Sequence, residues 1–516
     1  MRVIFRVDAS IQMGTGHVMR CLTLAQALKE NGASVRFICR KHKGSLIGKI
    51  RSSGFNVYDL EVFEKAVIDN KLAHSHWLGA TQKQDATECI NILSSSEVYL
   101  LVVDHYGIDE DWHNDLRPYC KKIIVIDDLA DRKHNCDFLL DQNYTQDKSR
   151  YDLLVSPGAV KFLGPKYALL REDFVKNIKQ RAWFTESVSR VFIFFGGTDP
   201  DNLTNIALQS LCQSKLKHLF IDVVIGLTNP NRDVIEREVS KNPKATLYIQ
   251  TDRISELMIK ADVSLGSGGM ATWERMALGL PSIVITTAEN QIPSIKSLYR
   301  DGYVVWLGSS NRVDKKIIYN AMLDFIENFE KSREKSRKCQ ALVSGKGAKN
   351  ISDLLIFGPS LRDLVVRKAE IADSLLYWYW VNDAVVRENS LSQKCIKWID
   401  HQKWFNDKLK NTNSVLLLVE FDTFLIGQVR FDCKASSCLI DYSIAKQFRG
   451  FGLGKVVLRE AICHFQKNCS LPLIGGVKKD NIASEKIFKD LGFYKINSHL
   501  PLNNMNTFRL QHHLNL

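Results

Sequence analysis

Short apolar runs alternate with longer amphipathic stretches over the first part of the chain. RVIFRV opens the sequence, and a glycine loop with the helix-like CLTLAQALKENG follows it. The alternation continues through the apolar runs SVRFICR, VYLLVVD, KKIIVIDD and DFLLD. Strands that alternate with helices in this way form a parallel sheet with helices on its faces. We therefore expect a βαβα fold at the N-terminus.

A second alternating set opens at SRVFIFFGG, residues 189–197. It continues through FIDVVIG, TLYIQ, ADVSLGS and PSIVITT, with helix-like segments between them. Two successive doubly wound units predict two Rossmann-like domains that face each other across a cleft. The link between them falls near residues 175–188.

The pattern changes near residues 350–362. An aromatic-rich helix, SLLYWYWVND, precedes SVLLLVEF, LIGQVRF and SCLIDYSI, which are typical of antiparallel strands with short turns. A glycine loop then leads into a helix in QFRGFGLGKVVLREAICHFQ. The predicted fold class is therefore α/β. Two Rossmann-like domains occupy residues 1–180 and 185–355, and an α+β domain occupies residues 360–516.

Composition describes an ordinary globular protein, because 45% of its residues are hydrophobic and 25% are charged. No apolar run approaches the ~20 residues of a membrane span. The N-terminus lacks the apolar region and cleavage site of a signal peptide. We therefore expect a cytoplasmic protein without membrane contact. The sequence does not indicate an oligomeric state.

The net charge of +13 is scattered along the chain. Anionic small molecules explain it as well as nucleic acid does, and we expect no nucleic-acid partner. The 12 cysteines form no CxxC pair, and Cys433 and Cys438, which come closest, lack a second pair at zinc spacing. We expect reduced core cysteines and no metal.

The stretch GTGHVMR, residues 14–20, follows the opening strand. Gly14 and Gly16 allow a tight loop and the close approach of a ligand to the backbone. His17 then lies in the first turn of a helix, where the helix dipole favours the neutral imidazole that accepts a proton. Asp8, at the end of the strand, is a candidate to orient it. A capping histidine without chemistry is the alternative.

The second unit carries SGGMATWERMALGLPSI, residues 267–283. Gly268 and Gly269 precede a helix whose free N–H groups can hold a diphosphate. Glu274 lies within the first turns of that helix, where it can accept hydrogen bonds from two ribose hydroxyls. A solvated helix carboxylate is the alternative. AENQ, residues 288–291, follows the next strand at the edge where ligands meet such sheets.

These features resemble the GT-B fold of UDP-sugar enzymes. Residues 1 to about 350 resemble more closely the UDP-2,4-diacetamido-2,4,6-trideoxy-β-L-altropyranose hydrolases of pseudaminic acid synthesis. The matching stretches are RVDASIQMGTGHVMRC, HWLG, VVDHYGID, IDDLADRKHNCDFLLDQN, GPKYALLREDF, FFGGTD, GGMATWE and AENQ.

The resemblance implies a role for each matching residue. His17 would be the general base that deprotonates a water attacking the anomeric carbon, with UDP leaving. UDP would be bound by the helix-start glycines and the glutamate of the WE motif. No metal is expected beside it. The implied UDP and substrate contacts are Gly268, Gly269, Glu274, Arg171, Asn290 and Gln291, and the candidate sugar contacts are Asp104, His105 and Tyr106.

The third domain carries SIAKQFRGFGLGKVV, residues 443–457, between a strand and a helix. Its glycines fit the pattern Q/R-x-x-G-x-G/A, in which successive backbone N–H groups form a cradle for a pyrophosphate. With KKDNIASEKIFKDLGFYKI further on, residues 365–500 resemble the GNAT N-acetyltransferases, which bind acetyl-CoA as cosubstrate at this loop. The implied cofactor contacts are Gln447, Arg449, Gly450, Gly452, Gly454, Lys455, Asn481 and Ser484.

The general acid of this domain is not assigned by the resemblance. Many members carry a tyrosine four residues after the serine of N-x-x-S, but here that position is Phe488. Tyr494 and Tyr442 are candidates for the role, and packing in the core or on an edge strand is the alternative for both.

The two resemblances together predict a bifunctional enzyme of pseudaminic acid synthesis, which supplies flagellin or cell-surface glycosylation. The GNAT domain would acetylate the 4-amino group of UDP-4-amino-4,6-dideoxy-β-L-AltNAc, and the GT-B-like domains would hydrolyse the product. A GT-B glycosyltransferase that uses a UDP-sugar, fused to a non-catalytic acetyl-CoA-binding module, is the alternative. Such a transferase needs an acceptor groove.

Overall fold

The computed structural model describes residues 1–63, 71–95, 97–178, 187–359, 364–390, 392–422, 424–496 and 505–510. The chain forms two compact units. The first contains Met1–Val155 and Lys161–Ile356, and the second contains Ser156–Val160 and Phe357–Leu516. Most of the expected link near residues 175–188 lies outside the described residues. The boundaries at 180, 185, 355 and 360 stay predictions.

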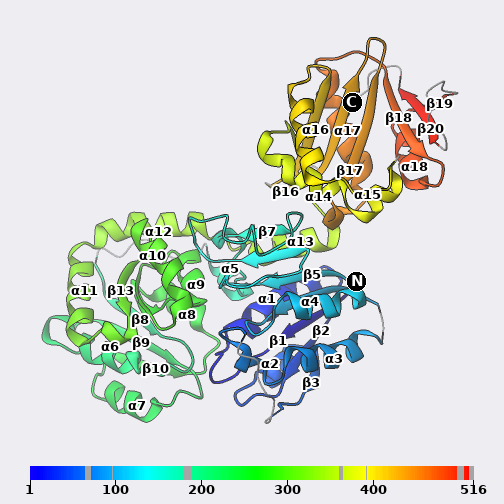
Figure 1. Ribbon diagram of the computed structural model, residues 1–516. Helices are drawn as coiled ribbons and strands as arrows, with labels where there is room; N and C mark the ends of the chain where they lie inside the picture. The colour runs from blue at the N-terminus through cyan, green and yellow to red at the C-terminus, as the bar shows by residue number, and fades with distance from the viewer. Residues whose placement is uncertain are drawn as a thin grey trace. The chain divides into compact units, whose positions relative to one another are not determined.

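The first sheet has the strand order β3-β2-β1-β4-β5-β6-β7, and its strands from β3 to β6 run parallel (Figure 1). Its inner strands are apolar almost throughout because both of their faces are buried. The strands are β1 (Arg2–Val7), β2 (Ser34–Arg40), β3 (Asn56–Leu60), β4 (Val98–Asp104), β5 (Cys120–Ile126), β6 (Phe138–Asp141) and β7 (Val160–Leu163). The helices are α1 (Gly16–Glu30), α2 (Ile47–Ser52), η1 (Ser75–Leu78), α3 (Gln82–Leu93), α4 (Glu110–Leu116), η2 (Arg117–Tyr119), η3 (Pro165–Tyr167) and α5 (Glu172–Asn177).

The second sheet has the order β10-β9-β8-β11-β12-β13 and is parallel throughout. Apolar side chains of its strands and of α6 and α11 form one core cluster. The strands are β8 (Arg190–Phe194), β9 (Phe220–Ile225), β10 (Ala245–Ile249), β11 (Val263–Ser267), β12 (Ser282–Thr286) and β13 (Val305–Ser309). The helices are α6 (Leu203–Leu211), η4 (Ser214–Leu216), α7 (Arg232–Ser240), α8 (Ile254–Lys260), α9 (Ala271–Ala277), η5 (Glu289–Gln291), α10 (Ile292–Arg300), η6 (Ser310–Arg312), α11 (Lys315–Glu327), α12 (Phe329–Leu342) and α13 (Gly347–Phe357).

Both sheets are doubly wound, and their switch points follow from the strand orders. The order reverses between β1 and β4 in the first sheet and between β8 and β11 in the second. Loops diverge at such a point and leave a crevice at the carboxyl ends of the strands. The first unit thus has the GT-B architecture of two Rossmann-like halves, and His17 and Gly268 follow switch-point strands.

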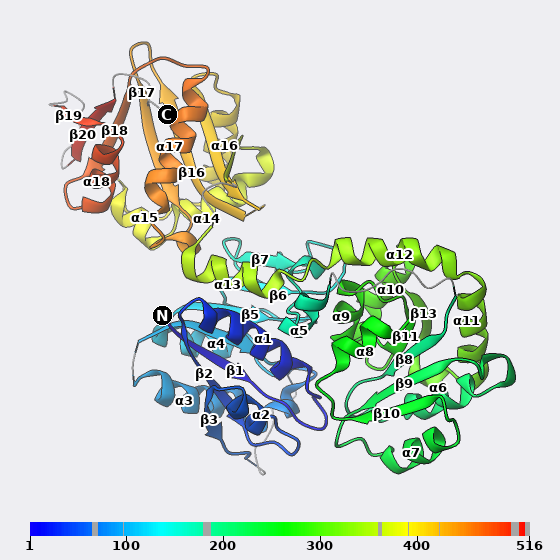
Figure 2. The same ribbon diagram turned by 180° about the vertical axis from the view of Figure 1, so that it is seen from behind.

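The second unit contains a sheet of order β14-β15-β16-β17-β18-β20-β19, with α17 packed against β15, β16 and β17 (Figure 2). Neighbouring strands are antiparallel in the described residues except β17 and β18, which are parallel and are joined by the crossover helix α17. The strands are β14 (Leu364–Lys368), β15 (Ser414–Phe421), β16 (Phe424–Cys433), β17 (Cys438–Ile444), β18 (Leu473–Lys478), β19 (Tyr494–Ile496) and β20 (Met505–Leu510). The helices are η8 (Ile371–Asp373), α14 (Ser374–Val381), α15 (Ala384–Asn389), α16 (Trp398–Lys410), η9 (Lys446–Phe448), α17 (Leu453–Gln466) and α18 (Ile482–Asp490).

The strands β17 and β18 pair at one end only and separate toward the other. Cys438–Ile440 pair with Leu473–Gly475, and the register between the two strands extends no further in the described residues. The edge of β17 from Asp441 to Ile444, which leads directly into the glycine loop, therefore faces a gap in the sheet.

The expectation that the cysteines are reduced is wrong for one pair. Cys433 and Cys438 lie directly opposite each other at the end of the β16–β17 hairpin and form a disulfide. The Sγ atom of Cys469 lies 3.9 Å from that of Cys438. Among the described residues, these three cysteines are the group whose sulfur atoms lie close enough together to hold a metal ion, but the disulfide leaves the thiol of Cys469 as the single ligand. No helix in the described part of the chain is both long and apolar enough to cross a bilayer.

Candidate functional site

His17 lies at the start of α1, beside the end of β4. The Nδ1 atom of His17 is 2.6 Å from Oδ1 of Asp104, the last residue of β4. A carboxylate can only accept, so Nδ1 carries the proton and donates it to Asp104. The other ring nitrogen, Nε2, is then left with a lone pair. Gly14, with φ of 72°, turns the loop that brings His17 to this position.

A buried network fixes Asp104. Arg20, one turn further along α1, donates to both Asp104 oxygens from Nε and Nη2, at 2.6 and 2.7 Å. Its Nη1 donates to Asp128, which also accepts from the hydroxyl of Tyr106 at 2.6 Å. Burial raises the pKa of Asp104, but Arg20 and His17 outweigh it and lower the pKa, so this carboxylate stays charged.

The expectation that Asp8 orients His17 is wrong. Val7 pairs in register with Asp104, and successive side chains of a strand point to opposite faces, so Asp8 and Asp104 point away from each other. Asp8 accepts from the backbone N–H of Arg40 at 2.6 Å and pairs with Arg6 at 2.8 Å. His105 lies 3.5 Å from Asp8 and is buried, and burial lowers the pKa of His105 to about 3.

Aromatic side chains lie beside the ring of His17, which is buried. Its ring centroid lies 4.6 Å from that of Tyr106 and 6.3 Å from that of Trp77 in η1. Trp77 stacks on Tyr106 at 5.7 Å and contacts His74 at 4.4 Å. Sequence reasoning did not assign Trp77, His74, Arg20 or Asp128, although HWLG is one of the matching stretches.

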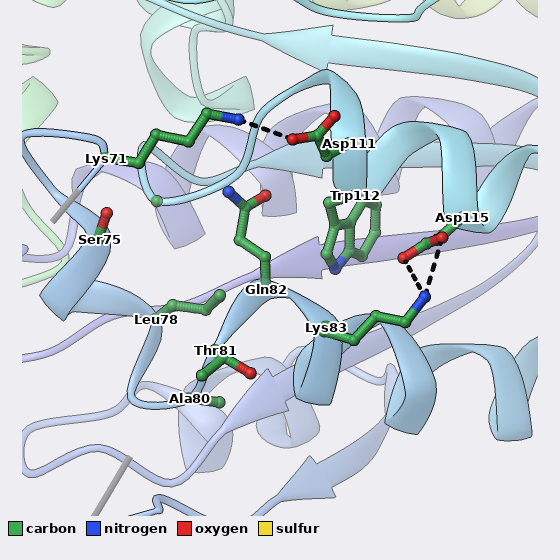
Figure 3. A pocket seen from close by; sticks show the side chains of 11 residues that line it. Lys71, Ser75, Leu78, Ala80, Thr81, Gln82, Lys83, Asp111, Trp112 and Asp115 are labelled. Atoms are coloured by element: carbon green, nitrogen blue, oxygen red, sulfur yellow. Dashed lines mark hydrogen bonds and ion pairs between the residues drawn. The ribbon is translucent and has the colours of Figure 1, made fainter. Parts of the chain in front are cut away.

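A pocket of about 300 Å³ lies beside η1, the short helix that carries Trp77 (Figure 3). Its charged lining consists of ion pairs: Lys71 contacts Asp111 at 2.7 Å and Lys83 contacts Asp115 at 3.1 Å. These charges balance, so the pocket offers no net positive charge to an anionic ligand. Its lining residues are Lys71, Ser75, Leu78, Ala80, Thr81, Gln82, Lys83, Gly107, Asp111, Trp112 and Asp115.

In the second half of the unit, Gly268 and Gly269 join β11 to α9. A Cβ atom on Gly268 would lie 2.7 Å from Ile295 and 3.1 Å from Oε1 of Gln291, so the loop packs closely against η5 and α10. Gln291 accepts from the backbone N–H of Thr287 at 3.0 Å, and Asn290 precedes it in the same short helix. The sequence-predicted glycines and AENQ residues therefore lie together.

Arg171 contacts the predicted ribose-binding residue itself. Its Nε donates to Oε1 of Glu274 at 3.0 Å, and its guanidinium stacks on Phe174 at 4.7 Å. Glu274 is buried. Burial raises the pKa of Glu274, and Arg171 opposes the rise. In the structure Arg171 thus fixes the direction of this carboxylate.

The two halves meet through Met270, the residue after the glycine pair. A Cβ atom on Gly16 would lie 3.5 Å from Met270 Cγ, and Gln142 Nε2 lies 2.7 Å from Met270 Sδ. The loop before His17 and the loop before α9 are therefore in contact, so a ligand held by Gly268 and Gly269 would lie close to His17.

In the second unit, the glycine loop leads into α17. Gly450 and Gly452 have φ angles of 88° and 71°, which a residue with a side chain rarely adopts. Gly452 is the N-cap of α17 and has no side chain to cap the N–H groups of the first turn. A Cβ atom on Gly454 would lie 2.7 Å from Ile487 of α18. The loop thus presents backbone donors, as an anion cradle requires.

The predicted polar residues of the loop take part in other contacts. Gln447 donates to the carbonyl oxygen of Gly158, and Arg449 pairs with Asp383 at 2.6 Å. Lys455 lies 3.9 Å from Asp490 and is half-exposed.

Asn481 and Ser484 lie at the start of α18. Oδ1 of Asn481 accepts from the backbone N–H of Ser484 at 3.0 Å and so caps the helix. The hydroxyl of Ser484 lies 3.0 Å from that of Tyr442, on the part of β17 that pairs with β16 but, in the described residues, not with β18. Tyr494, on β19, is 46% exposed.

Comparison with known proteins decides the class of the second unit. Residues 363–494 match the family model described as acetyltransferase (GNAT) domain. The second unit contains a GNAT domain. Its antiparallel sheet, the parallel β17–β18 pair and the glycine loop before α17 belong to this domain.

Similar proteins cover the part of the chain that precedes the GNAT domain. A UDP-2,4-diacetamido-2,4,6-trideoxy-β-L-altropyranose hydrolase of Campylobacter jejuni is 29% identical over 59% of this chain and 98% of its own. A spore coat polysaccharide biosynthesis protein of Bacillus subtilis is 22% identical over 69% of this chain and 98% of its own. An uncharacterized protein of Methanocaldococcus jannaschii is 26% identical over 96% of this chain and 97% of its own. The chain is thus a fusion of a GT-B-like region related to that hydrolase with a GNAT domain.

Proposed function

We propose that the chain catalyses two consecutive steps of pseudaminic acid synthesis. The GNAT domain transfers an acetyl group from acetyl-CoA to the 4-amino group of UDP-4-amino-4,6-dideoxy-β-L-AltNAc. The first unit hydrolyses the product, UDP-2,4-diacetamido-2,4,6-trideoxy-β-L-altropyranose, to the free sugar and UDP. The observation that carries the hydrolase half is the His17–Asp104 pair beside the Gly268–Gly269 loop, in a region related to a hydrolase of this name.

The geometry around His17 supports a general-base mechanism. Asp104 holds the Nδ1 proton, so Nε2 can accept a proton from water. The water oxygen attacks the anomeric carbon, and the bond from that carbon to the diphosphate oxygen breaks with its electron pair on UDP. The imidazolium that forms is stabilised by Asp104, which Arg20 holds in place.

The second half of the unit supports nucleotide binding. Gly268 and Gly269 allow a diphosphate to approach the backbone, and Glu274 offers a carboxylate to ribose hydroxyls. Arg171 donates to that carboxylate at 3.0 Å, so Glu274 is oriented before a nucleotide arrives.

Acetyl transfer in the GNAT domain would proceed directly. The lone pair of the neutral sugar amine attacks the thioester carbonyl, and the carbon–sulfur bond breaks. The amine nitrogen loses a proton and the CoA sulfur gains one. The backbone donors after Gly450 suit the pyrophosphate of CoA, and the gap beside Asp441–Ile444 suits its extended tail.

The experiment that tests both steps is a mass-resolved incubation of the full chain with acetyl-CoA and UDP-4-amino-4,6-dideoxy-β-L-AltNAc. We expect free UDP together with the 2,4-diacetamido sugar. Accumulated UDP-diacetamido sugar would contradict the hydrolase half, and unchanged substrate would contradict the acetyltransferase half. UDP release from the UDP-diacetamido sugar without any acceptor would argue against a glycosyltransferase.

Replacing Glu274 with Gln should weaken UDP binding by about 10-fold. A hydrogen bond to a charged acceptor contributes roughly 1.5–3 kcal/mol, and the amide keeps the shape of the side chain but loses the charge. Calorimetric titration with UDP measures the effect. Glu256→Gln, on α8 with a 50% exposed side chain, is the matched control. Equal UDP affinity in Glu274→Gln and the control would contradict the role of Glu274.

A further inference from the structure

Phe488 cannot supply the proton that acetyl transfer requires. Its ring is 2% exposed and packs against Phe493 at 4.8 Å and Phe508 at 6.0 Å. A Cβ atom on Gly475 would lie within 2.4 Å of two of its ring carbons, so the ring covers the sheet at that glycine. The position that usually carries the tyrosine is therefore apolar core in this chain.

A tyrosine hydroxyl lies nearby on a different element. Tyr442 stands on β17, two residues past Ile440, where β17 and β18 part. Its ring lies 6.0 Å from that of Phe488, and the Cβ position of Gly454 is 4.0 Å from its Cε2 atom. The hydroxyl thus lies between the glycine loop and the first turn of α18.

The other described tyrosines of this unit are placed less well. Tyr377 is buried and donates to the carbonyl oxygen of Leu417 at 3.3 Å. Tyr379 lies against Gly158. Tyr494 is on β19, which pairs with β20 and does not border the gap beside β17. Tyr442 is the described tyrosine that faces both the glycine loop and α18.

We propose that Tyr442 is the general acid of the GNAT domain and protonates the CoA sulfur as it leaves. This inference rests on the proposed acetyltransferase function. We expect the tail of acetyl-CoA to run from the glycine loop along the β18-facing edge of Asp441–Ile444, because the backbone groups on that edge have no strand partner among the described residues. Tyr442 stands on this edge, so its hydroxyl borders the path of the thioester.

Ser484 completes the proton path. Its hydroxyl lies 3.0 Å from that of Tyr442 and can donate to the phenolate that forms. The proton that Tyr442 gives to sulfur is replaced, through water, by the proton that the amine nitrogen loses, so the cycle is balanced. Burial raises the pKa of Tyr442, with the Ser484 hydrogen bond opposing it, and the hydroxyl is therefore protonated at neutral pH.

The test compares the full wild-type chain with Tyr442→Phe, which removes only the hydroxyl and keeps the ring. CoA release is followed with a thiol reagent, and CoA affinity by calorimetry. We expect kcat for acetyl transfer to fall about 10²-fold. The KM for acetyl-CoA and the affinity for CoA should change less than about twofold, because catalysis and not positioning is lost.

Two further variants test the partner of Tyr442 and the other candidate tyrosine. Ser484→Ala keeps the backbone N–H that Asn481 caps, and it should lower kcat about 10-fold. Tyr494→Phe should leave kcat unchanged. Equal kcat in wild type and Tyr442→Phe would overturn the assignment of Tyr442 as the general acid but would leave the proposed acetyltransferase function standing. A loss of CoA affinity that matches the loss of rate would also overturn it, since Tyr442 would then only position the cosubstrate. No CoA release by the wild type would overturn the acetyltransferase function and this inference together.

Discussion

Replacing His17 with Ala should lower kcat for UDP release from UDP-2,4-diacetamido-2,4,6-trideoxy-β-L-altropyranose by roughly 10²–10⁴-fold. In the proposed mechanism the Nε2 lone pair is the proton acceptor, and the alanine variant has no substitute for it. The proposed UDP site lies in the other half of the unit, around Gly268 and Glu274, so UDP affinity should change little. Steady-state kinetics and calorimetric titration with UDP measure the two quantities separately.

His218→Ala is the matched control for this prediction, because His218 lies on the surface of the second half of the same unit. The kcat of His218→Ala should equal that of the wild type. A drop in UDP affinity as large as the drop in kcat for His17→Ala would assign His17 to ligand binding. A kcat within about threefold of the wild type would exclude it as the base.

The second large effect concerns stability. Asp85 is fully buried and accepts from Arg6 at 3.1 and 2.6 Å, from Arg40 at 2.7 Å and from Trp112 at 3.0 Å. Asp85→Asn leaves two buried guanidinium groups with less negative charge. Breaking a buried pair in this way costs about 3–5 kcal/mol. Differential scanning calorimetry should show the transition of the first unit lowered by on the order of 10 °C.

The stability that Asp85→Asn loses relative to the wild type depends on pH, and it decreases toward acidic pH. Burial raises the pKa of Asp85, but Arg6 and Arg40 outweigh it and lower the pKa below its ordinary value. The contribution of a carboxylate with a lowered pKa is complete above its unfolded pKa, about 3.9, and is lost as the pH falls below it. The difference between wild type and Asp85→Asn should therefore shrink below about pH 4.

Asp115→Asn is the control for Asp85. Asp115 pairs with Lys83, whose side chain is 78% exposed, so the change should cost less than about 1 kcal/mol. Equal transition temperatures in the two variants would show that the buried network contributes no more than a surface pair.

The sequence was sufficient to locate the buried parallel strands along the chain and the loops that follow their carboxyl ends. A parallel strand buried on both faces is a continuous apolar run, as in VYLLVVD, and its end is marked by a polar residue. His17 and Gly268 both follow such strands, β1 and β11. Shorter strands such as β3, β13 and β14 were not predicted, because about five half-buried residues have no distinctive period.

Which carboxylate reaches His17 was not predictable in the same way. Asp8 and Asp104 both end or follow a buried strand, and only the register between β1 and β4 decides which face each one meets. Trp77 and His74 belong to a loop segment whose approach to Tyr106 depends on the tertiary fold. The disulfide was not predicted for the same reason. Cys433 and Cys438 lie opposite each other only because of the register between β16 and β17.

Ser156–Val160 belongs with the second unit, although the chain on either side of it belongs to the first. During synthesis this segment leaves the ribosome long before Phe357 does, so its neighbours in the second unit are still absent when the surrounding chain begins to fold. A fragment that begins at Phe357 would lack these residues, including the Gly158 carbonyl that accepts from Gln447. The two halves of this fusion are therefore interleaved along the chain, and a single cut does not separate them.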